Sequence, residues 1–142
     1  MIKIILISHG PYCHGLLKSL LMIAGPTSDL VAVELHEGET PEAYRNRLEQ
    51  EIKGELKSLI LCDVRGGTPY NSAAFLAKKY PFLLITGMNM PMLLSIVTLR
   101  NEQLNLKDLA KMTIQSDNLG VDLIDFRTGG KGHHAKLSIN KD

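Results

Sequence analysis

The sequence has 142 residues, a formal net charge of +1 and 44% apolar residues, which together describe one domain with a sizeable core. The near-balance of charges excludes a strongly basic surface for nucleic acid. The longest mainly apolar stretch, residues 16–24, is too short for a membrane span, which needs about 20 residues. Because the chain starts without a basic and then apolar leader, we expect a cytoplasmic protein.

Residues 2–7 are mostly branched apolar residues, and this run stops at Ser8, His9 and Gly10. Such a run, bounded by a turn signal, is typical of a strand buried on both faces of a parallel sheet. The pattern places His9 at the carboxyl end of the strand, where open α/β sheets bind their ligands. The alternative is that His9 only marks the polar end of a strand.

The rest of the chain alternates between helical and strand patterns. Amphipathic spacing, with capping residues such as Thr40 and Asn105, predicts helices over residues 12–24, 40–52, 70–79, 91–99 and 106–116. Apolar runs predict further strands over residues 30–35, 58–63, 82–86 and 121–126. From residue 127 onward the periodicity is lost, so we expect a domain over residues 1–126 and a mobile tail over 127–142.

Strands and helices that alternate with short connections predict an α/β fold, a mostly parallel sheet with helices on both faces. Periodicity does not fix the order of the strands. We expect the flavodoxin-like order 2-1-3-4, in which the first and third strands are neighbours where the order reverses. His9 and Asp63, which ends the third strand, would then face one crevice.

A carboxylate beside a histidine prepares the imidazole for chemistry. Asp63 can accept the proton on Nδ1 of His9, which fixes the tautomer and leaves a lone pair on Nε2. An imidazole held in this way acts as a nucleophile or as a base. The alternative is an aspartate that only caps a loop.

The residues that follow the third strand supply donors for an anion. Gly66 and Gly67 can present backbone N–H groups, and Thr68, which we expect to cap the next helix, adds a hydroxyl. The positive end of that helix points at the same place. Arg65 is either a further donor to phosphate or a solvated loop residue. A plain strand-to-helix turn is the alternative explanation for this segment.

A neutral imidazole next to an anion-binding turn predicts phosphoryl transfer to and from histidine. The sequence contains no Walker A motif, no dinucleotide-binding glycine fingerprint and no paired acidic residues for Mg²⁺. We therefore expect no cofactor and no metal, and a phosphoryl group that another protein supplies.

The other histidines are weaker candidates. We expect His14 on a helix surface or at the rim of the pocket, and His36 at the end of an edge strand. A metal site made of His9, Cys13, His14 and Asp63 is disfavoured, because adjacent residues on a helix cannot both point inward.

The loop after the fourth strand contains Met88, Asn89 and Met90. Thioether side chains adapt to irregular contacts, so this loop is either a packing segment or a surface for a partner protein. We expect the partner surface.

Three segments resemble the mannose-class enzyme IIA component of the bacterial phosphoenolpyruvate:sugar phosphotransferase system. They are ILISHG (5–10), DVRGGTPYN (63–71) and TGMNMPML (86–93), and their order and spacing match along residues 1–126. The resemblance implies that the carrier protein HPr phosphorylates His9, which passes the group to a IIB component. It also implies that Asp63 orients His9 and that Thr68 helps to hold the phosphate.

The resemblance further implies a homodimer in which the final strand is antiparallel and exchanged between subunits. It is compatible with an association with the membrane components IIC and IID through IIB. From charge and the length of the apolar stretches we expect neither binding of nucleic acid nor insertion into the membrane. Two other functions stay open: a IIA-like regulatory module that senses phosphorylation, and a histidine-dependent phosphatase. Such phosphatases usually need an arginine in the loop after the histidine, where this chain has Gly10, Pro11 and Tyr12.

Overall fold

The computed structural model describes residues 1–115 and 119–128. Within these ranges four strands form one parallel sheet in the order β2-β1-β3-β4, which confirms the predicted order 2-1-3-4. The strands are β1 (Lys3–His9), β2 (Leu30–Leu35), β3 (Ser58–Cys62) and β4 (Phe82–Thr86).

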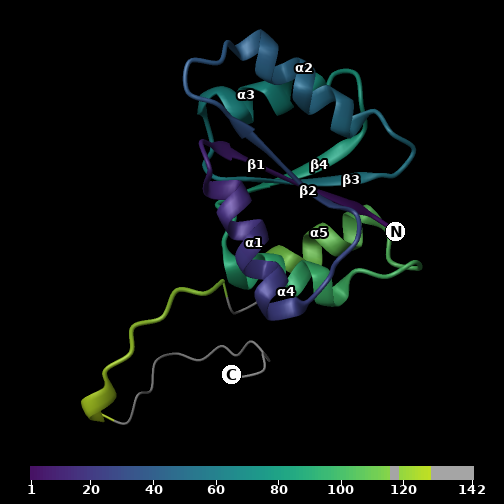
Figure 1. The fold of residues 1–142 in the computed structure, drawn as a ribbon. Helices are drawn as coiled ribbons and strands as arrows, with labels where there is room; N and C mark the ends of the chain where they lie inside the picture. Colours follow the sequence, from purple (N-terminus) through teal and green to yellow (C-terminus); the bar gives the residue numbers. More distant parts are fainter. Residues whose placement is uncertain (116–118, 129–142) are drawn as a thin grey trace.

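Helices cover both faces of the sheet, as the alternating pattern predicts. In Figure 1, α2 and α3 lie above the sheet, and α1, α4 and α5 lie below it. Their bounds are α1 (Tyr12–Ala24), α2 (Pro41–Ile52), α3 (Gly67–Leu76), α4 (Met90–Leu99) and α5 (Leu106–Ile114). None of the helices in the described ranges has the length and apolar character that crossing a membrane requires.

The two central strands are buried on both faces because their side chains alternate between two cores. In β1, Ile4 and Leu6 pack toward α1 and α4, whereas Ile5 and Ile7 pack toward α2 and α3. All four side chains are fully buried, and each contributes about 1.5–3 kcal/mol by leaving water. The carboxyl end of β1 is therefore held firmly in place.

The register of the sheet brings the ends of β1 and β3 together. Ile7 is paired with Cys62, and the N–H of Asp63 donates to the carbonyl of Ile7 at 3.1 Å. His9 and Asp63 therefore leave neighbouring strands at the same edge. On the other side of β1, His9 pairs with Leu35 of β2, which is an edge strand as predicted.

Helix caps follow the capping residues of the sequence in most places. The Thr40 hydroxyl accepts the N–H of Ala43, and the Asn105 side chain accepts the N–H of Asp108, so both predicted caps are confirmed. Helix α1 has no side-chain cap at Pro11. Its first turn is capped instead by Ser8, a residue of β1 whose function is described below.

Helix α3 begins three residues earlier than predicted, at Gly67 rather than Tyr70. Its cap is Gly66, so the prediction that Thr68 caps this helix is wrong. Gly66 and Gly67 have φ angles of +98° and +84°, a left-handed conformation that glycine adopts without strain. This double glycine lets the chain turn at once from β3 into α3, which places Thr68 inside the first helical turn.

The predicted final strand does not form within a single chain. Residues 121–125 are not paired as a strand, and η1 (Phe126–Thr128) is a short 3₁₀ turn. Figure 1 shows residues 119–128 running away from the sheet. Val121, Leu123 and Phe126 are 89%, 86% and 85% exposed. The predicted tail over 127–142 lies, from residue 129 on, outside the described residues.

Candidate phosphoryl-transfer site

His9 and Asp63 form a hydrogen-bonded pair at the carboxyl edge of the sheet. His9 Nδ1 lies 2.8 Å from Asp63 Oδ2, and the backbone N–H of His9 donates to the same oxygen at 2.9 Å. An ionised carboxylate accepts hydrogen bonds only, so Nδ1 carries the proton and Nε2 of the neutral ring carries the lone pair. The His9 side chain is 49% exposed, which leaves its free nitrogen open to a reacting group.

The Asp63 carboxylate is itself fixed by the surrounding backbone. Its Oδ1 accepts the N–H of Val64 at 2.8 Å, and the Cys62 thiol lies 3.5 Å from the same oxygen. Burial of this side chain would by itself raise its pKa. The hydrogen bonds from His9 and Val64 outweigh burial and hold the pKa of Asp63 below its usual value. Asp63 is therefore ionised at neutral pH and able to stabilise positive charge on the ring.

The double glycine lies directly against the reactive edge of the ring. A Cβ atom built on Gly67 would be 2.7 Å from both Cε1 and Nε2 of His9, whereas one built on Gly66 would meet no atom within 4 Å. Helix α3 starts at this point, so the positive end of a ten-residue helix faces the ring. The structure thus brings together His9, Asp63, Gly66 and Gly67, as the sequence predicts.

Thr68 and Arg65 flank this centre. Thr68 is half-buried in the first turn of α3, and Arg65 is exposed in the loop before it. Among the described residues neither side chain makes a hydrogen bond or an ion pair. Their roles as phosphate ligands are taken up under the proposed function.

The family of PTS system fructose IIA components matches residues 3–114 of the sequence. The chain belongs to this family. It is 39% identical over 113 residues to the PTS system fructose-specific EIIA component of Bacillus subtilis, an alignment that covers 77% of each chain. The mannose-class enzyme IIA resemblance read from three short segments is thereby confirmed.

Two solved structures show the same fold as this IIA component. The EIIA component from Streptococcus agalactiae superposes with a TM-score of 0.80 at 33% identity, covering 90% of this chain and 99% of that one. A mannose/sorbose-specific IIA subunit from Enterococcus faecalis superposes with a TM-score of 0.79 at 30% identity, covering 87% and 95%. The chain is thus one component of a sugar phosphotransferase system.

In this IIA component the loop after β4 is less open than predicted. Met88 is only 2% exposed and packs in the core with α1 and α4, so its prediction as a residue of a partner surface is wrong. Asn89 caps α4, because its side chain accepts the N–H of Met92 at 2.9 Å. Met90 is half-buried against the same core. The sequence pattern did not distinguish this packing function from a surface function.

Two residues near His9 support the site without an obvious signal in the sequence. The buried Ser8 hydroxyl accepts the N–H of Cys13 and donates to the carbonyl of Gly10, both at 2.9 Å. Tyr12 reaches from the start of α1 to the β4–α4 loop, where its hydroxyl donates to the carbonyl of Met88 at 2.9 Å. Together these contacts fix the loop that follows His9. Ser8 could have been suspected from its place four residues before the start of a helix with no side-chain cap of its own.

His14 and His36 share a different carboxylate on β2. His14 Nδ1 lies 2.6 Å from one oxygen of Glu34, and His36 Nδ1 lies 3.7 Å from the other. Cys13 is buried in the core beside them. Residues 1–115 and 119–128 hold no group of three or more His, Cys, Asp or Glu side chains arranged to bind a metal.

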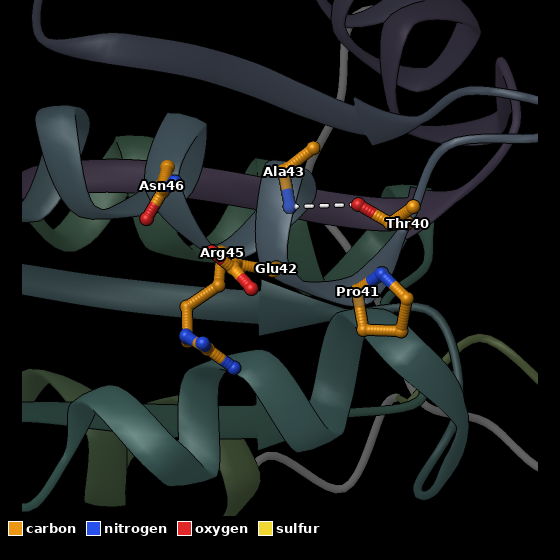
Figure 2. A pocket seen from close by; sticks show the side chains of 6 residues that line it. All are labelled: Thr40, Pro41, Glu42, Ala43, Arg45 and Asn46. Atoms are coloured by element: carbon orange, nitrogen blue, oxygen red, sulfur yellow. Dashed lines mark hydrogen bonds between the residues drawn. The ribbon is translucent and has the colours of Figure 1, made fainter.

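A shallow hollow of about 690 Å³ lies on the first turn of α2. Figure 2 shows it lined by Thr40, Pro41, Glu42, Ala43, Arg45 and Asn46, with the Arg45 side chain directed toward α3. None of these residues belongs to the group around His9. His9 lies outside this hollow, and its side chain is 49% exposed.

Proposed function

We propose that this IIA component is a phosphocarrier of sugar uptake in the cytoplasm. His9 accepts a phosphoryl group from phospho-HPr and passes it to a IIB component. The observation that carries the proposal is the half-exposed His9 ring, which Asp63 holds by Nδ1 while its Nε2 edge lies against a glycine turn. The protein is thus a phosphotransferase that uses no cofactor of its own.

In the proposed transfer, the lone pair on His9 Nε2 attacks the phosphorus atom of the donor. The bond between phosphorus and the donor protein breaks, and its electron pair stays with the donor. The ring gains positive charge as the new nitrogen–phosphorus bond forms, and the Asp63 carboxylate on Nδ1 stabilises that charge. Delivery to the IIB component is the reverse process, in which the nitrogen–phosphorus bond breaks and the lone pair returns to Nε2.

The turn after β3 supplies the stabilisation of the phosphoryl oxygens. We infer that the N–H groups of Gly66 and Gly67, the positive end of α3 and the Thr68 hydroxyl take part. Arg65, in the exposed loop before α3, adds a charged donor in this proposal. Asn89, which caps α4, and Met90, its first residue, contribute to the surface that the partner proteins contact.

We also propose that the functional unit is a homodimer, built on a domain over residues 1–126. Within residues 1–115 and 119–128 no strand pairs with the outer edge of β4, and the apolar side chains of Val121, Leu123 and Phe126 face water. Exchange of this segment as an antiparallel strand would cover both features. The IIB component then links the dimer to the membrane components IIC and IID.

The proposal is tested with phospho-HPr that carries a labelled phosphoryl group. We expect one acid-labile label per chain, and none on His9→Ala. The matched control is His14→Ala, because His14 also rests on a carboxylate and is 46% exposed. Full labelling of His9→Ala, or loss of label only in His14→Ala, would overturn the assignment of His9.

A panel of IIB proteins then separates a carrier from a regulatory module. A carrier loses its label to at least one IIB protein, and the lost label appears on that protein. A chain that becomes labelled but transfers to no IIB protein would be the phosphorylation-sensing module instead. A chain that releases inorganic phosphate from small esters without HPr would be a phosphatase.

A further inference from the structure

The two glycines of the turn share a positive φ angle but differ in their surroundings. Their φ angles are +98° and +84°, so a side chain at either position would strain the backbone. Only Gly67 has a neighbour at the place of the missing Cβ, and that neighbour is the Cε1–Nε2 edge of His9 at 2.7 Å. The space around a Cβ on Gly66 is empty to 4 Å.

The His9 ring cannot yield to a side chain at position 67 and keep its partner. The ring is held by the 2.8 Å hydrogen bond to Asp63 Oδ2 from Nδ1, the nitrogen bonded to Cε1. The carboxylate cannot follow the ring, because it is fixed by the N–H groups of His9 and Val64. A methyl group on Gly67 would therefore push the imidazole off Asp63.

The same methyl group would fill the space next to the reacting atom. Nε2 is the nitrogen with the lone pair, and a group bonded to it has to lie within bonding reach on its open side. The position of the missing Cβ is 2.7 Å from Nε2, which is within the volume that phosphoryl oxygens would need. The lack of a side chain thus affects both the ring and the group it carries.

We propose that Gly67 is a positioning residue for phosphoryl transfer, which keeps His9 on Asp63 and keeps the volume beside Nε2 free. This inference rests on the proposed function of His9. It assigns Gly67 a steric function that Gly66 does not share, in addition to the N–H groups that both can offer.

A double-mutant cycle separates the contact with His9 from backbone strain. Gly67→Ala and Gly66→Ala are each made in the parent chain and in His9→Ala, and the midpoint of thermal unfolding is measured. Removing the ring should spare Gly67→Ala about 5 °C of its loss in the midpoint, whereas the loss caused by Gly66→Ala should be the same in both backgrounds. The difference between the two alanine variants should therefore change by about 5 °C from the parent to His9→Ala, because the ring that the methyl group meets is gone.

The proposal is supported if the effect of Gly67→Ala on stability depends on the presence of the His9 ring. This includes the case in which Gly67→Ala folds only when His9 is also replaced by alanine. An equal difference between the two alanine variants in both backgrounds, or no difference in either, overturns it. The cycle needs no phosphoryl donor, so it decides about Gly67 even where the wild-type chain takes up no label and the proposed function fails.

Spectroscopy and transfer rates provide the functional half of the test. Nitrogen-15 NMR of the His9 imidazole should show the tautomer with protonated Nδ1 in the wild type and its loss in Gly67→Ala. Labelling by phospho-HPr should be about 100-fold slower in Gly67→Ala than in the wild type, the size of effect that a misplacement of about 1 Å produces. Wild-type labelling rates and an unchanged tautomer in Gly67→Ala would refute the assignment.

Discussion

Oxygen Oδ2 of Asp63 accepts two hydrogen bonds from one residue, the backbone N–H and the ring nitrogen of His9. The hydrogen bond from the backbone N–H positions the oxygen, and the hydrogen bond from Nδ1 then orients the ring against that oxygen. This arrangement ties the orientation of the imidazole to the main chain of β1, which is buried on both faces. The tautomer of His9 is thus set by the fold before any partner binds.

Asp63→Asn tests this arrangement at the scale of one residue. The variant is isosteric and should fold, but it removes the negative charge that stabilises the ring as it becomes positive. We expect the labelling rate from phospho-HPr to fall by about 100-fold or more, with circular dichroism unchanged.

Asp108→Asn is a suitable control, because Asp108 is an exposed carboxylate on α5 and does not touch the site. Its labelling rate should match the wild type. An Asp63→Asn chain that is labelled at the wild-type rate would show that the carboxylate only caps the loop.

The sequence predicted the elements well where one physical signal dominates. The apolar run of residues 2–7 and the threonine cap before α2 each have one structural solution, and both are observed. The start of α3 was missed because Gly66 and Gly67 look like a loop in composition. Only their left-handed φ angles turn the chain into the helix, and composition does not reveal these angles.

The site was predictable only in part, namely where the ends of neighbouring strands determine which residues meet. His9 and Asp63 end neighbouring strands, so strand order alone brings them together. Met88 was placed on the surface because methionine suits both cores and interfaces. Its burial follows from how α1 and α4 meet, which no local pattern encodes. Ser8 and Tyr12 act through contacts with Cys13 and Met88, and such contacts are equally invisible before folding.

At the scale of the elements, the loop between β2 and α2 is held by an ion pair between its own Glu39 and Arg47 of α2. Arg47 of α2 donates from Nε and from one terminal nitrogen to the two oxygens of Glu39, at 2.8 and 2.7 Å. The hydrogen bonds from Arg47 lower the pKa of Glu39 to about 2. The same Arg47 nitrogen also donates to the carbonyl of Glu34, so the loop is fastened next to the end of β2.

This pair predicts an acid-dependent loss of stability. The folded pKa of Glu39 lies below the value of 4.5 for a free side chain, so its stabilisation is fully present above about pH 4.5. It is lost as the pH falls toward 2. The free energy of unfolding of the wild type should therefore exceed that of Glu39→Gln at pH 7, and the two should converge between pH 4.5 and 2.

Urea unfolding at several pH values measures this difference, with Glu37→Gln as the control. Glu37 is exposed in the same loop and makes no hydrogen bond or ion pair among the described residues. Its variant should follow the wild type at every pH. A gap between wild type and Glu39→Gln that stays constant down to pH 2 would contradict the assignment.

At the scale of the whole molecule, one buried arginine joins the end of α4 to the start of the sheet. Arg100 is 8% exposed, and its guanidinium donates to the carbonyls of Ile2, Ser28 and Asp29 at 2.7, 2.8 and 3.1 Å. Burial lowers the pKa of Arg100. The side chain therefore connects three segments that are distant in sequence, at the edge of the sheet opposite to His9.

Arg100→Met should destabilise the fold by about 2–3 kcal/mol, because it removes three hydrogen bonds of a buried guanidinium, one of them to the carbonyl of the buried Ile2. Lys107→Met, an exposed change on α5, should alter the free energy of unfolding by less than about 0.5 kcal/mol. Urea unfolding checks both. An Arg100→Met chain as stable as the wild type would mean that water replaces the guanidinium at these carbonyls.

His9 ends β1 and Asp63 directly follows β3, so both are attached to the two innermost strands, which has a consequence for thermal inactivation. Fraying begins at termini and loop tips, whereas the backbone of this pair is tied to the sheet itself, since the N–H of Asp63 donates to the carbonyl of Ile7. The reactive pair persists until the sheet itself comes apart. On heating, the ability to accept a phosphoryl group and the folded structure should be lost in one cooperative step, without a folded state that has lost this ability.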